Sequence, residues 1–154
     1  MTKTLILVRH AHALSRYEAH VATDGERPLS AQGEQKARQT AHALLGQKVA
    51  PQIILTSPLL RAVQTAEILA QTLRIPVQKE SLLDGFHPDN DVRDFLLEQF
   101  EHFSAVIAVS HNPVITYVNA LLSGQVIPFG AGDFTILDMS DLEHPKLIFT
   151  GAEK

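Results

Sequence analysis

The sequence predicts an α/β fold, specifically a single-domain three-layer α/β/α sandwich with a mostly parallel central sheet. The first observation behind this prediction is that strand-like and helix-like segments alternate along the chain, as they do in βαβ units. The second is that three strand-like segments lack an alternating polar face, which is typical of strands buried on both sides. These segments are residues 5–8, 52–56 and 105–109.

Length and composition are those of one globular unit. The chain has 154 residues, of which 45% are hydrophobic and 19% charged, so we predict one domain over residues 1–154. A net charge of −4 argues against nucleic acid or an anionic membrane as the main partner. The chain has no cysteine, which excludes disulfides and thiolate chemistry. Without a signal-like or membrane-length apolar run, we expect a cytoplasmic protein that binds no membrane.

The elements between the first two strands differ in their patterns. Residues 13–29 are polar and have no clear period, so we expect a long loop, and loops of this length are often functional. Ser30 is an expected helix N-cap, and Gly46 stands where the same helix would end. The apolar residues between them recur at helical spacing: Ala37, Ala41, Leu44 and Leu45.

Two later helices follow buried strands and begin near a proline. Ser57-Pro58 predicts a capping hydroxyl followed by a proline at the first helical position, and this helix ends before Pro76. Asn112-Pro113 predicts a second start of the same kind. The expected inner faces are Ala62, Ala66, Leu69, Ala70 and Leu73 for the first helix, and Val114, Val118, Leu121 and Leu122 for the second.

The remaining elements are shorter. Residues 77–79 predict a short strand, and residues 81–88 predict a loop rich in turn formers. Residues 134–138 and 146–150 predict two closing strands, antiparallel to each other or at a sheet edge. The helix before the third buried strand is marked by its apolar residues Val92, Phe95, Leu96, Phe100 and Phe103.

Each of the three buried strands ends in polar residues. Arg9-His10 follows the first strand, Thr56-Ser57 ends the second with Arg61 shortly after it, and Ser110-His111 ends the third. Carboxyl ends of parallel strands share one sheet edge, so these side chains are expected around one crevice. Arginines, imidazoles and helix N-termini together favour a phosphoryl group, and so many donors would be excessive for a carboxylate.

Three segments resemble the histidine phosphatase superfamily, the group of phosphoglycerate mutases and acid phosphatases. They are Arg9-His10 after a hydrophobic strand, residues 57–66 (SPLLRAVQTA) and residues 109–113 (VSHNP). The short chain, residues 27–33 (RPLSAQG) and the lack of a large helical insertion look most like the SixA-type phosphohistidine phosphatase branch. The resemblance spans roughly residues 4–125 and implies a phosphoglycerate mutase-like fold.

The resemblance implies a covalent phosphatase mechanism. His10 would attack phosphorus and become phosphohistidine, while Arg9, Arg61 and His111 would hold the phosphoryl oxygens. Arg27 is expected to join them from the loop as a substrate-binding residue. No metal and no cofactor are implied, because the arginines supply the positive charge. The expected substrate is a phosphohistidine-bearing protein, with a small phosphate ester as the alternative.

The sequence departs from the family pattern after the histidine. Ala11 and His12 stand where the family usually has glycine and often an acidic residue, so a different turn is expected there. The phosphate-binding asparagine of the mutases is not evident in the loop after His12, which weakens a mutase assignment. The sequence leaves the roles of His12 and His87 open.

The general acid is the least defined role. Asp84 is the candidate, with Asp89 and Asp91 nearby, but turn or helix-cap roles explain these residues as well. A P–N substrate needs such an acid less, because its imidazole leaving group accepts a proton near neutral pH.

Two other functions are open at this stage. His10-Ala11-His12 is similar to the metal-binding pair of amidohydrolase barrels, although such barrels need roughly 250 residues and alternating side chains diverge on an extended segment. A phosphate-binding module without turnover is the second alternative. The sequence does not indicate the oligomeric state.

Overall fold

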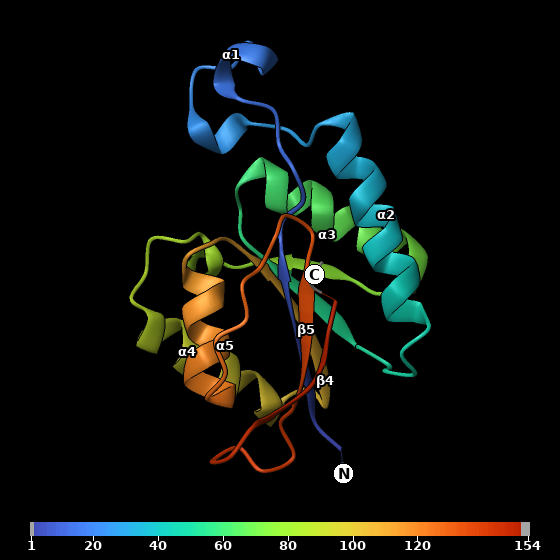
Figure 1. Cartoon of the computed structure of the whole chain (residues 1–154), viewed down its shortest axis with the longest axis vertical. Helices are drawn as coiled ribbons and strands as arrows, with labels where there is room; N and C mark the ends of the chain where they lie inside the picture. The colour runs from blue at the N-terminus through green and yellow to red at the C-terminus, as the bar shows by residue number, and fades with distance from the viewer. Residues whose placement is uncertain (1, 152–154) are drawn as a thin grey trace.

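The computed structural model describes residues 2–151, and within them six strands form one sheet in the order β3-β2-β4-β1-β5-β6 (Figure 1). Strands β3, β2, β4 and β1 are mutually parallel, and β5 and β6 continue the sheet in antiparallel fashion. The mostly parallel sheet and the antiparallel closing pair agree with prediction. The bounds are β1 Thr4–Arg9, β2 Ile53–Thr56, β3 Val77–Lys79, β4 Ala105–Ser110, β5 Phe134–Asp138 and β6 Lys146–Thr150.

Helices cover both faces of this sheet, so the predicted three-layer sandwich is confirmed. Helices α2 (Ala31–Leu45) and α3 (Leu60–Leu73) lie on one face, and α4 (Asp89–Glu98) and α5 (Val114–Ser123) lie on the other (Figure 1). Strand β1 serves both layers because successive side chains point to opposite faces. Its Ile6 and Val8 join the cluster beneath α2 and α3, whereas Leu5 and Leu7 join the cluster beneath α4 and α5.

Two residues expected on inner helix faces lie outside. Leu45 is 58% exposed at the end of α2, and Leu121 is 46% exposed on α5. Each sits one residue from a buried leucine, Leu44 or Leu122, so a rotation of about 100° per residue carries it off the apolar stripe. The prediction that both pack inward is therefore wrong.

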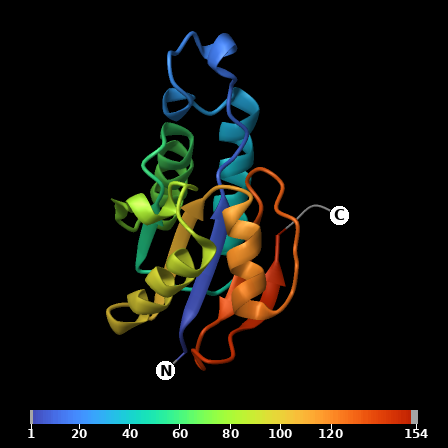
Figure 2. The same ribbon diagram turned by 90° about the vertical axis from the view of Figure 1, so that its left-hand side faces the viewer.

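The segment expected to be one long loop contains two short helices. Helix α1 (Arg16–Ala19) begins with a capping box between Ser15 and Glu18, and a 3₁₀ turn, η1, spans Asp24–Glu26. A β-bridge between Ala13 and Leu29 closes the base of the segment. Figures 1 and 2 show it projecting from the body of the molecule above the end of β1. Local side-chain hydrogen bonds give the segment its shape without the apolar period that predicts a helix.

Helix starts fit the sequence prediction only at Ser30, whose hydroxyl accepts the Gly33 N–H at the start of α2. Helix α3 begins at Leu60, later than predicted, and the Ser57 hydroxyl accepts the Leu59 N–H in the preceding turn. Helix α5 begins at Val114 after a cis Asn112–Pro113 peptide bond.

The Asn112 side chain makes long-range contact instead of capping α5, because its amide donates to the carbonyl of Phe129. The expected capping roles of Ser57 and Asn112 are therefore wrong. Two further 3₁₀ turns complete the described residues: η2 (Ser81–Leu83) in the expected loop and η3 (Gln99–Glu101) after α4. No helix within residues 2–151 is long and apolar enough to cross a membrane.

Candidate active site

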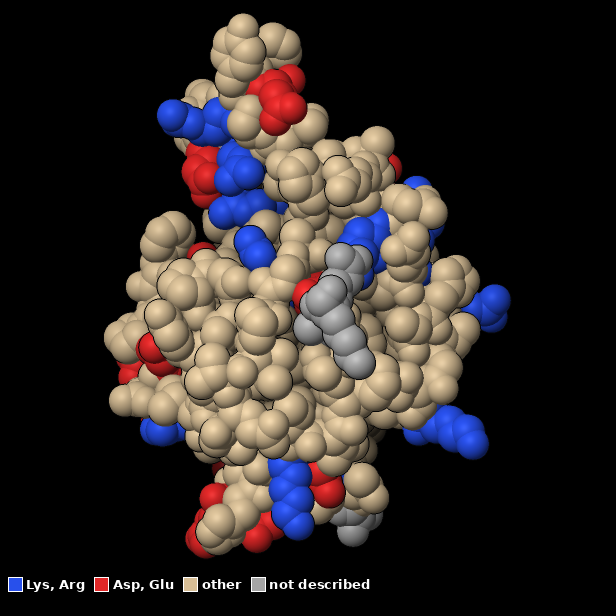
Figure 3. All heavy atoms as spheres, in the orientation of Figure 1, with Lys and Arg blue, Asp and Glu red and all other residues tan. Residues whose placement is uncertain are grey.

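The carboxyl ends of β1, β2 and β4 meet at one edge of the sheet, and a pocket of about 370 Å³ opens there. The pocket brings together Arg9, His10 and His111 from the ends of β1 and β4, and Arg61 from the first turn of α3, which follows β2. Figure 3 shows basic side chains gathered at the foot of the projecting segment. The lining consists of Arg9, His10, Arg27, Arg61, Asp84, Gly85, Phe86, His111, Asn112 and Pro113.

The His10 imidazole is held in one tautomer. Its Nδ1 lies 2.8 Å from the carbonyl oxygen of Ala11, and because a carbonyl only accepts, Nδ1 carries the hydrogen. Nε2 is then left with its lone pair. Burial and, to a smaller extent, the positive charges of Arg61 and Arg9 lower the His10 pKa to about 4, against the opposing effect of the Ala11 hydrogen bond. The His10 imidazole is therefore neutral near pH 7.

The turn after His10 accommodates alanine in place of the family's glycine. Ala11 is fully buried, and its N–H donates to the Thr65 hydroxyl, which in turn donates to the carbonyl of Arg61. Ala11 is not among the described non-glycine residues with positive φ, so this turn does not require glycine. Glycine is instead required at Gly33, where the backbone of α2 approaches the His12 backbone so closely that a Cβ would lie 2.0 Å from the His12 carbonyl oxygen.

His111 faces His10 across the pocket. The two ring centroids are 4.9 Å apart with an interplanar angle of 57°, and His111 Nε2 lies 2.7 Å from the Ser57 hydroxyl. Burial lowers the His111 pKa to about 3, helped by His10 and Arg61, so this ring is also neutral near pH 7. Gly85, at a φ of +91°, turns the chain directly against the His111 ring, where a side chain would be strained.

Two buried nitrogens in this group, Arg9 Nε and His111 Nδ1, make no hydrogen bond within the described residues. Buried polar groups are nearly always paired, so both retain unused hydrogen-bonding capacity next to the pocket. The Arg9 guanidinium is oriented by one donated bond, 2.8 Å long, to the carbonyl of Phe129. Burial lowers the Arg9 pKa from its ordinary value and nearby Asp133 opposes this, yet an arginine remains charged.

The other two arginines share one carboxylate. Arg61 is only 7% exposed, and its guanidinium donates to both the backbone carbonyl and the side chain of Asp24, each at 2.9 Å. Arg27 donates to the other Asp24 oxygen at 3.0 Å and to the Leu14 carbonyl at 2.8 Å. The hydrogen bond from Arg27, and then that from Arg61, hold the pKa of Asp24 below its ordinary value. The structure thus places Arg27 at the pocket together with Arg61.

Asp84 lines the pocket and also shapes a turn, so both expectations for it describe its position. One of its carboxylate oxygens accepts the Phe86 N–H at 2.8 Å and lies 3.0 Å from His87 Nδ1. Asp89 and Asp91 instead lie in the first turn of α4 and do not line the pocket. Among the three acidic candidates, only Asp84 lines this pocket.

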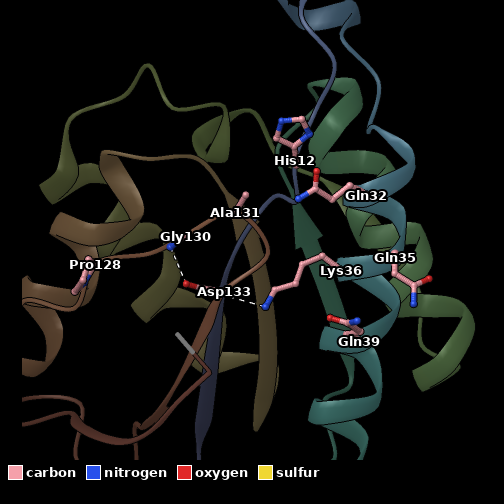
Figure 4. Close-up of a pocket in the computed structure, with 9 residues that line it drawn as sticks. All are labelled: His12, Gln32, Gln35, Lys36, Gln39, Pro128, Gly130, Ala131 and Asp133. Carbon is pink, nitrogen blue, oxygen red and sulfur yellow. Dashed lines mark hydrogen bonds and ion pairs between the residues drawn. The ribbon is translucent and has the colours of Figure 1, made fainter. Parts of the chain in front are cut away.

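His10 and His12 diverge. The ring of His12 bonds to the Ser30 hydroxyl at 2.7 Å and faces a separate cavity of about 480 Å³ bordered by α2 and residues 128–133 (Figure 4). Residues 2–151 contain no group of three histidine, aspartate or glutamate side chains that could hold a metal ion. The geometry gives no support to a His10–His12 chelating pair.

Several residues that build the site were not found from the sequence. Asp24 has no role in the prediction from sequence, although it stands three residues before Arg27, a spacing that permits an ion pair in a helical turn. Ser57 was assigned to capping, and the contribution of the Phe129 carbonyl has no local signal because it comes from 120 residues away.

Two neutral histidines and three arginines around one pocket at the edge of an α/β sheet indicate the class of phosphate-binding α/β proteins. Comparison with known families makes this class specific. Residues 5–89 match the histidine phosphatase superfamily (branch 1), and the chain belongs to that superfamily. It is a SixA-type member with the phosphoglycerate mutase-like fold, and the superfamily supports a phosphatase activity.

Individual relatives agree with this assignment. The phosphohistidine phosphatase SixA of Escherichia coli is 33% identical over 131 residues, covering 80% of this chain and 77% of that protein. A solved structure of the protein histidine phosphatase SixA, complexed with tungstate, superposes with a TM-score of 0.86 at 26% identity, covering 96% and 95% of the two chains. A mycobacterial glucosyl-3-phosphoglycerate phosphatase shares the fold, with a TM-score of 0.76 at 18% identity over 98% and 100% of the chains.

Proposed function

We propose that this protein is a metal-independent phosphatase that removes the phosphoryl group from phosphohistidine on a protein substrate through a phosphohistidine intermediate on His10. The observation that carries the proposal is the state of His10. A neutral imidazole with a free Nε2 lone pair stands among three arginines and a second neutral histidine. The similarity to SixA supports phosphohistidine as the substrate.

In the first step, His10 Nε2 attacks phosphorus and a new N–P bond forms while the substrate's N–P bond breaks. The leaving imidazole keeps the electron pair of the broken bond and takes up a proton, which it accepts readily near neutral pH. Arg9, Arg27 and Arg61 hold the three phosphoryl oxygens and stabilise the charge that spreads over them. His111 donates a further hydrogen bond when its proton resides on the nitrogen facing the phosphoryl group.

In the second step, water attacks the phosphoryl group on His10 and the N–P bond breaks. His10 recovers its lone pair on Nε2, and inorganic phosphate leaves as H₂PO₄⁻ with the oxygen and both protons of that water. The Ala11 carbonyl keeps the His10 ring oriented through both steps by accepting the Nδ1 hydrogen. The arginines supply the charge that a metal ion supplies in other phosphoryl-transfer sites.

A phosphatase for small phosphate esters is the second candidate, and the position of Asp84 favours it. An alkoxide leaving group needs a proton more than imidazole does, and the Asp84 carboxyl lines the same pocket as His10. In the phosphohistidine reaction, Asp84 would serve only as a turn residue that accepts the Phe86 N–H.

The test is a paired turnover assay on the purified protein. A protein carrying phosphohistidine and a panel of phosphate monoesters would be compared in the wild type and in Asp84→Asn. We expect strong preference for phosphohistidine and a small effect of Asp84→Asn on it. A preference for one ester, together with a large loss of turnover in Asp84→Asn, would show that the protein dephosphorylates small molecules instead. Phosphate binding without turnover of either substrate class would instead indicate a silent binding module.

A further inference from the structure

Asp24 occupies an unexpected place for an acidic residue, because it lies among the arginines of an anion site. Its two carboxylate oxygens accept one hydrogen bond each from Arg27 and Arg61, and its backbone carbonyl accepts a second bond from Arg61. Within residues 2–151, the Arg61 guanidinium makes two hydrogen bonds, and Asp24 accepts both of them. The orientation of this buried guanidinium is therefore set by Asp24 alone.

The local structure explains how one carboxylate reaches two cations from different elements. Residues 24–26 form the 3₁₀ turn η1, and side chains three residues apart eclipse in such a turn, so Arg27 stands beside Asp24. The Arg27 N–H also donates to the Asp24 carbonyl, which closes the turn. Arg61 comes from the first turn of α3 and meets the same residue from the other side.

Asp24 contributes little stability through these contacts. Its side chain is 54% exposed, and ion pairs open to water are screened. Its electrostatic effect on a bound phosphoryl group, taken alone, is repulsive. A carboxylate kept at this position therefore either orients the two guanidiniums for the substrate or competes with the substrate for them.

We infer that Asp24 is a positioning residue that fixes the Arg27 and Arg61 guanidiniums in the orientation that binds phosphoryl oxygens. The backbone carbonyl contact favours orientation over competition, because a phosphoryl group cannot displace a main-chain acceptor from the Arg61 fork as it could displace a side chain. Both arginines also keep unused N–H groups after contacting Asp24, since each guanidinium has five. This inference rests on the proposed function, in which these arginines hold the phosphoryl group.

Asp24→Asn separates orientation from charge. The amide has nearly the same size and keeps one acceptor, but its NH₂ group places donors against one of the two guanidiniums. Removing a negative charge would strengthen phosphate binding if charge alone mattered. If the guanidiniums lose their orientation, phosphate binding would weaken, by about tenfold when one charge-assisted hydrogen bond is lost. Calorimetric titration with inorganic phosphate measures the affinity directly and does not depend on turnover.

Glu26→Gln is the matched control. Glu26 lies in the same 3₁₀ turn, carries the same charge, and bonds to the Thr23 hydroxyl, with no hydrogen bond to either arginine. We expect its phosphate affinity to stay within about twofold of wild type. Asp24→Asn should also lose less affinity in an Arg27→Ala background than in the wild type, because one of its two targets is then absent. Thermal unfolding of every variant shows whether the fold is kept.

The outcomes are distinct. Weaker phosphate binding in Asp24→Asn, unchanged binding in Glu26→Gln and coupling to Arg27 would support the inference. Equal or tighter binding in a folded Asp24→Asn protein would overturn it and identify Asp24 as a competitor for the arginines. An equal loss in Glu26→Gln would also overturn it, because only the charge of the turn would then matter. A wild-type protein that binds no phosphate would overturn the proposed function, and this inference with it.

Discussion

The two sides of the candidate active site are built differently. One side is the edge of the sheet, where β1 and β4 end directly before His10 and His111 and the strand residues are buried up to Val8 and Ser110. The other side is the projecting segment of residues 13–29, which brings Asp24 and Arg27 to the pocket on a short 3₁₀ turn. The sheet edge holds the groups proposed to react, and the segment holds groups proposed to position the substrate. Changes on the two sides should therefore have different consequences.

The largest expected effect comes from the sheet edge. His10→Ala removes the proposed nucleophile, and the other imidazole that lines the pocket, His111, has its Nε2 bonded to the Ser57 hydroxyl. We expect turnover to fall by about 10⁴-fold or more in a phosphate-release assay. The alkali-stable, acid-labile label that marks phosphohistidine on the protein should disappear as well.

His12→Ala is the matched control for this change, because His12 faces the separate cavity beside α2. It should retain near wild-type turnover. A His10→Ala enzyme with substantial activity would remove His10 from its proposed role, and equal losses in both variants would point to a folding defect instead.

The difference between the two sides also decided what could be predicted from sequence. Arg9, His10 and His111 follow uninterrupted apolar strands, and parallel strands bring their carboxyl ends together whatever the connections between them are. That inference needs only periodicity. The layered fold was predictable for the same reason, because the spacing of apolar residues shows which sides of the strands and helices are buried.

The projecting segment gave no such signal. Its shape comes from the Ser15–Glu18 capping box, the η1 turn and the Ala13–Leu29 bridge, none of which has an apolar period. The helix starts were mislocated for a related reason. Ser57 and Asn112 form side-chain bonds to the distant partners His111 and Phe129, and such tertiary contacts override the local capping preference.

The second prediction compares an arginine from each side. Arg61 is buried on α3, whereas the Arg27 side chain is 27% exposed on the segment. We expect Arg61→Ala to lower kcat/KM by about 10³-fold and Arg27→Ala by about tenfold, since a charge in a drier site stabilises the transition state more. Steady-state kinetics on one substrate would measure both. Equal losses would mean that the two sides contribute alike, and near wild-type activity in Arg61→Ala would contradict its assigned role.

The third prediction concerns how the free energy of unfolding depends on pH through the two histidines at the sheet edge. The pKa of His10 is about 4 and that of His111 about 3, both below the ordinary value of 6.5. Between pH 6.5 and about 4, the unfolded chain binds protons that the folded chain excludes, so the free energy of unfolding falls as the pH falls through this window. Each histidine should contribute up to about 1.4 kcal/mol per pH unit.

Urea unfolding of the wild type and of His10→Asn at pH 7, 5.5 and 4.5 would measure this dependence. The variant lacks one titrating imidazole, so its stability should fall less steeply over the same range. Parallel pH profiles for the two proteins would show that His10 is not held neutral by the fold.

A smaller effect is expected at Asp84, which lines the pocket from the turn beside His111. With a phosphohistidine substrate, Asp84→Asn should change turnover by less than about threefold, because the leaving imidazole needs no added acid. With a phosphate monoester, the same variant should lose about 10²-fold or more. The ratio of the two defects is independent of protein concentration and of small folding losses. Equal defects on both substrates would mean that Asp84 acts only by shaping the turn next to His111.

The smallest expected effect is that of a chelator. Preincubation with excess EDTA, followed by removal of the chelator, should leave kcat and KM for phosphohistidine protein unchanged, because Arg9, Arg27 and Arg61 already neutralise the phosphoryl oxygens in the proposed mechanism. The informative comparison is with Arg61→Ala. If Mg²⁺ restored activity to that variant, the cation would be replacing the missing guanidinium, which would support a purely electrostatic role for Arg61. Chelator sensitivity of the wild type, reversed by added metal, would contradict the metal-independent mechanism and require a cation beside His10.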